Sequence, residues 1–289
     1  MPISFIHHII EGMAANKLNV LHWHIVDSQA FPFNGTAVPA LAHGAWSPEQ
    51  TYSSKDVADI VAYAKDRGVR VMIEVAALHS NLPPKPRLAL RGDGAQHRAG
   101  MPLQVDTPGH SASWGVGVPE VVADCPSVGV PEDGDGQLAL DPSRNETYAT
   151  VEALLRELGT LAPDGFFHLG GDEVRPQCWN SSSRVQAFMK EAGFKTIDEV
   201  ENYYIGKLLN EVAPRALGKE RTLVCYQEVF DNNLTLPKST TIAVWKRGNP
   251  NPKCALLLEP SHAATDRSIA RRLVTGSSCA RSATRSRRS

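Results

Sequence analysis

Two adjacent carboxylic acids, Asp172 and Glu173, are the residues of this sequence with the clearest chemical potential. They follow two glycines and a short apolar segment, residues 166–169, that predicts a buried strand. Glycine lets a substrate approach the backbone closely, and neighbouring carboxylates in a confined site repel each other, which raises the pKa of one of them. The pair can then supply a protonated donor beside an anion. The alternative is a helix N-terminus that carries acids, which the helix dipole favours.

Asp27 and His110 form a second candidate pair. Asp27 ends a predicted strand, residues 18–27, and His110 closes a turn with the sequence DTPGH at residues 106–110. An aspartate and a histidine brought together can tune a neighbouring carboxylic acid or relay its proton. The alternative is a histidine that is hydrogen-bonded in a loop and has no role in catalysis.

His22 and His24 lie close to Asp27 in the sequence but do not predict a metal site. Alternation along a strand places the two histidines on one face and Asp27 on the opposite face. No third ligand is evident in the sequence. We therefore expect no metal at this position.

Two aromatic residues, Tyr226 and Trp245, stand at or near the ends of predicted strands. Aromatic rings in such places commonly form the walls of a sugar pocket through contacts between ring faces and C–H groups. Ordinary core packing is the alternative for both rings.

Apolar periodicity gives these residues their framework. Helical spacing predicts helices over residues 4–13, 57–64, 151–161, 185–191 and 200–212, and short apolar runs predict strands over residues 18–27, 69–75, 166–169, 223–226 and 242–245. Ser53 or Ser54 is expected to cap the second helix. Strands that alternate with helices indicate an α/β fold with a parallel sheet. Five strands are predicted, whereas a closed (β/α)₈ barrel needs eight.

Composition excludes several classes of protein. The chain has 289 residues, of which 42% are hydrophobic and 21% charged, and a net charge of −1, so a large core is expected and a polyanionic partner such as nucleic acid is not. No apolar stretch is long enough to cross a bilayer, and residues 1–13 do not have the pattern of a signal peptide. Five cysteines do not suggest a disulfide-rich scaffold. Four Asn-x-Ser/Thr sequons, at Asn34, Asn145, Asn180 and Asn233, favour a secretory origin.

Two segments interrupt the α/β pattern. Residues 75–104 contain four prolines and no usable periodicity, and their composition resembles translated intron, so we expect an inserted loop. Residues 253–289 contain eight lysines and arginines against two acidic residues and present no apolar face, so we expect this tail to be disordered. The remaining residues of 1–252 are expected to form one catalytic domain.

Several motifs together resemble the β-N-acetylhexosaminidases of glycoside hydrolase family 20. They occur in the family's order at residues 22–32 (HWHIVDSQAFP), 105–114 (VDTPGHSASW), 168–174 (HLGGDEV), 178–180 (CWN), 226–231 (YQEVFD) and 244–245 (VW). The resemblance covers roughly residues 4–245 and is expected to end shortly after Trp245. It implies a (β/α)₈ TIM barrel that removes terminal β-linked GlcNAc or GalNAc with retention, through attack by the sugar's own acetamido oxygen.

The resemblance also implies roles for individual residues. Glu173 would be the acid/base, Asp172 would orient the acetamido group, and the Asp27–His110 dyad would support Glu173. Tyr226 and Trp245 would wall the acetamido pocket, and Cys125 and Cys178 would form a disulfide near the site. The family needs no metal or organic cofactor. Its members lie in lysosomes or outside the cell, which predicts a secretory route and amino-sugar glycans as partners, and a homodimer is possible for a longer parent protein.

The sequence also departs from the family pattern. The family's opening strand, with an arginine that grips the substrate, and its last strands are not recognisable, so we expect an incomplete barrel that is unstable alone. Ser28 stands where the family usually has Asp, and Tyr226 stands where it usually has Trp. A non-catalytic carbohydrate-binding remnant, or an inactive fragment of such an enzyme, therefore remains an alternative to a working glycosidase.

Overall fold

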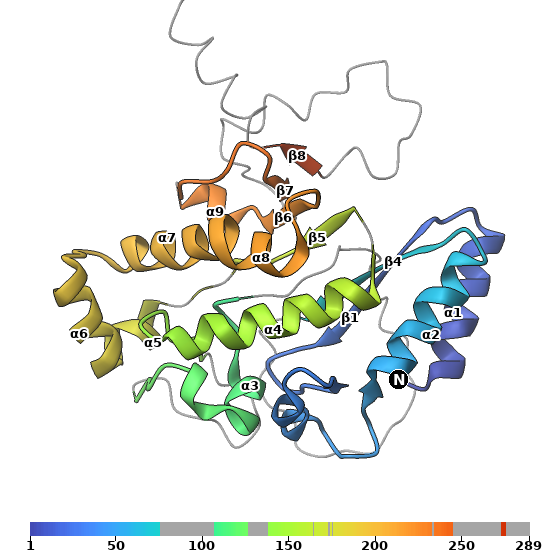
Figure 1. The fold of residues 1–289 in the computed structure, drawn as a ribbon, viewed down its shortest axis with the longest axis horizontal. Helices are drawn as coiled ribbons and strands as arrows, with labels where there is room; N and C mark the ends of the chain where they lie inside the picture. Colours follow the sequence, from blue (N-terminus) through green and yellow to red (C-terminus); the bar gives the residue numbers. More distant parts are fainter. Residues whose placement is uncertain are drawn as a thin grey trace, which may run out of the picture.

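The computed structural model describes most of the chain up to residue 244 (Figure 1). It describes residues 1–75, 107–126, 138–163, 165–172, 174, 176–232 and 234–244, together with a short strand at 273–275. The predicted insert, residues 75–104, lies outside this part of the chain except for Val75, and the predicted tail, residues 253–289, lies outside it except for that strand. Glu173 and Trp245 also lie outside the described residues.

The first part of the fold follows the predicted apolar pattern. Its elements are, in chain order, α1 (Ile3–Ala15), β1 (Val20–Val26), β2 (Phe33–Asn34), the 3₁₀ helix η1 (Pro39–Gly44), β3 (Tyr52–Ser53), α2 (Ser54–Lys65) and β4 (Arg70–Val75). Helix α1 buries Ile6, Ile10 and Met13, which recur at helical spacing. Helix α2 begins with a capping box, because the Ser53 hydroxyl accepts from the N–H of Asp56 and the Asp56 carboxylate accepts from the N–H of Ser53. Ser53 is therefore the cap.

The second part of the fold is mostly helical. Its elements are α3 (Ala112–Gly117), η2 (Pro119–Val121), α4 (Asn145–Leu161), β5 (Phe166–His168), α5 (Pro176–Ser181), α6 (Ser183–Ala192), α7 (Ile197–Lys207), the π-helical turn η3 (Leu208–Val212), α8 (Ala213–Leu217), β6 (Thr222–Tyr226), α9 (Glu228–Asp231), β7 (Thr241–Ala243) and β8 (Leu273–Thr275). Side chains cap α6 and α7, since the hydroxyls of Ser182 and Thr196 accept from backbone N–H groups in the first turns.

The principal strands form two parallel sheets. Strands β1 and β4 pair in parallel, with Val20 opposite Arg70, and strands β5, β6 and β7 form a second parallel set in that order. Strand β8 pairs with β7 in the antiparallel sense. Between β4 and β5 lies a hollow lined by side chains of both strands, including Val71, Ile73 and Phe167.

A closed TIM barrel is not seen in the described part of the chain. The parallel strands and covering helices confirm the predicted α/β class. The principal strands, however, fall into two sheets that are not joined by hydrogen bonds, and β2 and β3 form a third, two-stranded parallel sheet. The structure therefore supports the parallel sheets of the predicted (β/α)₈ barrel with missing strands, but the described residues do not show the closure of a barrel. None of the described helices has the length and apolar character needed to cross a bilayer.

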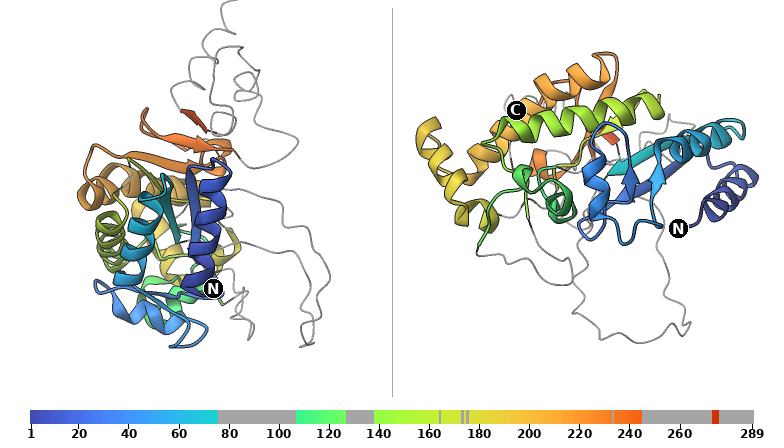
Figure 2. Two further views of the ribbon diagram at one scale, coloured as in Figure 1. Left: turned by 90° about the vertical axis from the view of Figure 1, so that its right-hand side faces the viewer. Right: turned by 60° about the horizontal axis from the view of Figure 1, so that its bottom comes forward.

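Helix α4 connects the two halves of the molecule (Figure 1). It runs between α2 on one side and α8 on the other and packs against both. The right panel of Figure 2 shows α1 and α2 at one end of the molecule and α6 at the other. Glu157 of α4 accepts hydrogen bonds from the N–H of Thr36 at 2.7 Å, the N–H of Ala37 at 2.8 Å and the hydroxyl of Ser54 at 2.6 Å. One carboxylate thus fixes the loop after β2 and the start of α2.

Candidate active site

The loop that carries Asp172 leaves the carboxyl end of β5. Gly170 and Gly171 both have positive φ, at 72° and 94°, a region that residues with a Cβ rarely adopt. A Cβ on Gly171 would lie 2.5 Å from Cγ1 of Val229, so both the backbone angle and the space require glycine. The loop leaves Asp172 buried, with 5% of its surface exposed. Glu173, the predicted acid/base, lies outside the described residues.

Tyr226 and His168 hold this loop from the side of β6. The N–H of Tyr226 donates to the carbonyl oxygen of Gly170 at 2.9 Å, and Nδ1 of His168 accepts from the N–H of Gly170 at 3.1 Å. The His168 and Tyr226 rings lie 4.5 Å apart between centroids. Tyr226 itself is buried and packs with Val224 and Ala243. The strand end that contains this predicted pocket residue therefore supports the Asp172 loop directly.

Asp27 follows the carboxyl end of β1 and meets a histidine of the same strand. Its Oδ2 lies 3.5 Å from Nε2 of His24, and its Oδ1 accepts from the N–H of Ser28. The prediction that Asp27 and His24 point to opposite faces is wrong. The pairing of β1 with β4 shifts register between His24 and Val26, and such an irregularity breaks the simple alternation of side chains.

The His110 turn is fixed by backbone hydrogen bonds to the segment that precedes α4. The N–H of Leu140 donates to the carbonyl of Pro108 at 2.7 Å, and the N–H of Ser111 donates to the carbonyl of Leu138 at 2.9 Å. His110 adopts a positive φ of 55°. Three residues further on, the hydroxyl of Ser113 donates to the backbone carbonyl of Asp27 at 2.7 Å. The structure thus brings the His110 segment to the end of β1, where Asp27 lies.

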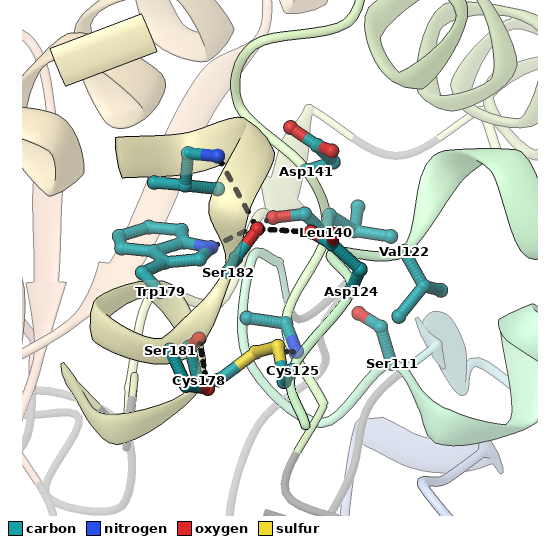
Figure 3. The surroundings of a disulfide bond; sticks show 12 residues. Ser111, Val122, Asp124, Cys125, Leu140, Asp141, Cys178, Trp179, Ser181 and Ser182 are labelled. Carbon is teal, nitrogen blue, oxygen red and sulfur yellow. Dashed lines mark hydrogen bonds between the residues drawn. A yellow bond between two sulfur atoms is a disulfide. The ribbon is translucent and has the colours of Figure 1, made fainter. Parts of the chain in front are cut away.

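A disulfide joins the segment after α3 to the helix that follows the acid pair (Figure 3). Cys125 and Cys178 are bonded, with their Cα atoms 4.7 Å apart, as the resemblance implies. Around this bond the N–H of Ala139 donates to Sγ of Cys178 at 3.3 Å, and Nε1 of Trp179 donates to the carbonyl of Leu140 at 3.0 Å. Helix α5 is therefore tied to the same segment, residues 138–140, that holds the His110 turn.

Two buried acids near the site received no role from the sequence. Glu228 follows Tyr226 by two residues and is 6% exposed, and Glu201 of α7 is 4% exposed. Burial of the Glu201 carboxyl raises its pKa to about 7, although hydrogen bonds from Asn232 act in the opposite direction. The motif at residues 226–231 contains Glu228, but nothing in the helical pattern of residues 200–212 separates Glu201 from a solvent-facing acid. Among the described residues, no group of three His, Cys, Asp or Glu side chains is placed to hold a metal ion.

Comparison with protein-family models decides the membership of the chain. The model described as "Glycosyl hydrolase family 20, catalytic domain" matches residues 1–77 and 99–263. The chain belongs to glycosyl hydrolase family 20. The match passes over residues 78–98, which fall inside the predicted insert. It continues to residue 263, so the expectation that similarity ends shortly after Trp245 is wrong.

The chain is also similar in sequence to beta-hexosaminidase subunits from mammals. The chain is 35% identical over 248 residues to beta-hexosaminidase subunit beta from Homo sapiens, covering 85% of this chain and 38% of that protein. It is 35% identical over 252 residues to subunit alpha from Rattus norvegicus, covering 86% of this chain and 41% of that protein. The chain therefore spans about two fifths of the length of these relatives.

Solved structures agree on the fold. The exo beta-N-acetylglucosaminidase of Vibrio harveyi, in complex with N-acetylglucosamine, superposes with a TM-score of 0.64 at 18% identity, over 89% of this chain and 37% of that one. The chitobiase of Flavobacterium johnsoniae gives a TM-score of 0.61 at 24% identity, over 87% of this chain and 32% of that one. At these identities the likeness establishes the fold alone.

Proposed function

We propose that this chain carries the catalytic machinery of an exo-β-N-acetylhexosaminidase, which removes a terminal, non-reducing β-linked GlcNAc or GalNAc from a glycan. The observation that carries the proposal is the Asp172 loop, a buried carboxylate that follows two left-handed glycines and is held by Tyr226 and His168. Its place in a family 20 chain that is 35% identical to beta-hexosaminidase subunits supports the same activity.

The first step of the proposed reaction forms an intermediate on the sugar itself. The carbonyl oxygen of the 2-acetamido group attacks the anomeric carbon while the glycosidic bond breaks, and Glu173 donates its proton to the leaving oxygen. Asp172 accepts a hydrogen bond from the acetamido N–H and offsets the positive charge that develops there. The product of this step is a cyclic oxazolinium ion.

The second step reverses the roles of proton donor and acceptor. Glu173, now a carboxylate, takes a proton from a water molecule that attacks the anomeric carbon on the face vacated by the leaving group. The oxazolinium ring opens, the acetamido group is restored, and Glu173 is protonated again. Two inversions at the same carbon give net retention, which departs from the two-carboxylate scheme of most retaining glycosidases.

The remaining predicted residues support this chemistry in our proposal. Asp27 and His110 act as a dyad that assists Glu173. The hydrogen bond from Ser113 to the Asp27 carbonyl supports this role, because it joins the segment of His110 to the end of β1. Tyr226 and Trp245 enclose the acetamido group. The mechanism requires neither a metal nor an organic cofactor.

Hydrolysis of a chromogenic N-acetyl-β-glucosaminide by the full chain tests the proposal. The sequence alone predicts an unstable chain, but the described residues enclose one large buried core, so we expect turnover by the wild-type chain. Glu173→Gln should lower kcat by about 10²–10⁴-fold, the range that general acid catalysis contributes. Glu191→Gln, on the exposed face of α6, is the matched control and should leave kcat unchanged. Binding of the substrate without turnover by the wild-type chain would instead establish a carbohydrate-binding protein.

We also propose that the protein passes through the secretory pathway. A disulfide between Cys125 and Cys178 is typical of an oxidising compartment. Three of the four sequon asparagines, Asn34, Asn145 and Asn180, are described by the structure, and all three are exposed. Glycosylation of these asparagines in a secretory host, seen as a mass shift that an amidase removes, tests this route.

A further inference from the structure

Glu201 is a buried acid that ties helix α7 to the segment after β6. Only 4% of its surface is exposed, and Nδ2 of Asn232 donates to both of its carboxylate oxygens, at 3.3 Å and 3.2 Å. Asn232 caps the C-terminus of α9, the short helix that follows Tyr226. Figure 1 shows α9 next to α7. A buried carboxyl group usually pairs with a positive charge. Glu201 instead accepts from the neutral amide of Asn232, so its burial calls for an explanation.

The same two helices form the wall behind the Asp172 loop. Ile205 lies one turn after Glu201 on α7, and Val229 belongs to α9. A Cβ on Gly171 would meet Cγ1 of Val229 at 2.5 Å and Cδ1 of Ile205 at 3.5 Å. Gly171 directly precedes Asp172, so a movement of α9 relative to α7 changes the surface on which the acid loop rests.

Acidic groups face Glu201 from both elements packed around it. Asp198 lies one turn earlier on α7, and Glu228 lies on α9. Burial is the main cause that raises the pKa of Glu201 to about 7, and the charges of Asp198 and Glu228 act in the same direction. The carboxyl group therefore changes its charge in the neutral range. When it ionises, the hydrogen bonds from Asn232 become stronger, but the carboxylate is desolvated and is repelled by Glu228 across the contact that keeps α9 in place. The direction of the pKa change shows that burial and repulsion outweigh those bonds.

We propose that Glu201 is a positioning residue for the glycosidase reaction: its uncharged carboxyl, held by Asn232, keeps α9 against Gly171 and so keeps Asp172 in place, whereas its ionisation loosens α9 and slows turnover. This inference rests on the proposed function, because the property that it controls is the placement of the acid pair. It assigns no contact with substrate to Glu201.

The ratio of kcat between Glu201→Gln and wild type, measured across pH, tests the proposal. Glutamine keeps the acceptor for Asn232 and cannot ionise, so we expect a ratio near one at pH 5 that rises about fivefold by pH 8, with KM changed less than about twofold. Glu201→Ala removes the tie and should lower kcat about tenfold at both pH values. A ratio that stays constant with pH overturns the proposal.

Asn202→Ala is the matched control. The Oδ1 atom of Asn202 accepts from the N–H of Thr235 at 2.9 Å, which links the same two segments through a group that does not titrate. Its kcat relative to wild type should not vary with pH. A rise with pH equal to that of Glu201→Gln would assign the effect to loosening of the segment in general and overturn the role of the Glu201 charge.

Hydrogen exchange separates a failure of this inference from a failure of the proposed function. A wild-type chain that hydrolyses no substrate refutes the proposed function, but the amides of residues 169–172 still report on the acid loop. We expect faster exchange there in Glu201→Ala than in Glu201→Gln at pH 6, and no difference in α1. Equal exchange of residues 169–172 in the two variants overturns the inference, whatever the activity.

Discussion

The N–H of Tyr226 donates a 2.9 Å hydrogen bond to the carbonyl oxygen of Gly170, two residues before Asp172. This bond extends the pairing of β5 with β6 past the end of β5, so that the acid loop continues the edge of the sheet instead of leaving it freely. The position of the Asp172 carboxylate therefore depends on the backbone geometry at Gly170 and Gly171.

Gly171→Ala should damage the site more than an ordinary glycine replacement. The new Cβ would meet Val229 at 2.5 Å on a backbone with φ of 94°, so we expect a loss of about 2 kcal/mol in unfolding free energy and a fall in kcat/KM of about 100-fold. Gly193→Ala is the control, because Gly193 has φ of 77° but nothing within 4 Å of its added Cβ. It should cost about 1 kcal/mol and leave kcat unchanged; equal kinetics in the two variants would argue against strain at the acid loop.

Ser113→Ala should lower turnover with little effect on stability. The Ser113 hydroxyl is the link from the His110 segment to the carbonyl of Asp27, and its loss should cost about 1 kcal/mol of unfolding free energy and about tenfold in kcat. Ser111→Ala is the control, since the Ser111 hydroxyl donates within its own turn, to the carbonyl of Gly109 at 2.9 Å. Equal kcat values for the two variants, measured on a chromogenic substrate, would contradict a dyad that depends on this link.

Glu157→Gln should weaken the fold at neutral pH and less so in acid. Burial alone would raise the pKa of Glu157, but hydrogen bonds from Ser54, Thr36 and Ala37 outweigh that effect and lower it. A lowered pKa adds stability that is complete above the ordinary value of 4.5 and is lost as the pH falls through the folded-state value. Because the group is partly exposed, we expect a difference of about 1 kcal/mol at pH 7, measured by urea unfolding.

The same experiment at pH 3.5 checks the sign of this effect. Wild type and Glu157→Gln should then differ less than they do at pH 7, because the carboxyl is increasingly protonated. Glu191→Gln, a change on the exposed face of α6, should show no difference at either pH. A gap between wild type and Glu157→Gln that does not narrow in acid would mean that the charge of Glu157 contributes nothing.

Removal of the disulfide should lower the free energy of unfolding, and the unfolding of the variant should no longer respond to reductant. Cys125 and Cys178 are 53 residues apart in the chain, and a cross-link of this span typically contributes about 2–4 kcal/mol. The double variant Cys125→Ala/Cys178→Ala should therefore unfold at lower urea concentration than oxidised wild type, and at nearly the same concentration as reduced wild type. If reductant destabilises the double variant as much as wild type, the effect of reductant on stability does not come from the bond between Cys125 and Cys178.

The sequence predicted the elements of the fold better than their assembly. Long apolar runs with clear periods located β1, β4 and α2, and the choice between Ser53 and Ser54 as cap was decided by the reciprocal bonds to Asp56. The pattern at residues 200–212 appeared as one helix but contains α7 and the π-helical turn η3. Periodicity does not report how strands from distant segments close, so the two separate sheets were not predictable from it.

The candidate site was predictable from motifs, but its supports were not. Strand alternation failed at Asp27 because a register shift in β1 follows His24, and no local pattern announces such a shift. Glu201 was missed because an acid in a helix usually faces solvent; its burial depends on Asn232, a residue that becomes a neighbour only through the fold. The glycines before Asp172, by contrast, were informative because their backbone angles require glycine.

Fluorination of the substrate's acetamido group measures the central claim most directly. If the carbonyl oxygen of that group is the nucleophile, then kcat of the wild-type chain on acetyl, fluoroacetyl, difluoroacetyl and trifluoroacetyl β-glucosaminides should fall with each fluorine, by about 100-fold or more over the series. The hydrolysis of the acetyl substrate should also disappear in Glu173→Gln. A rate that is insensitive to fluorine, or hydrolysis that persists in Glu173→Gln, would contradict the proposed mechanism and the role of the acid pair.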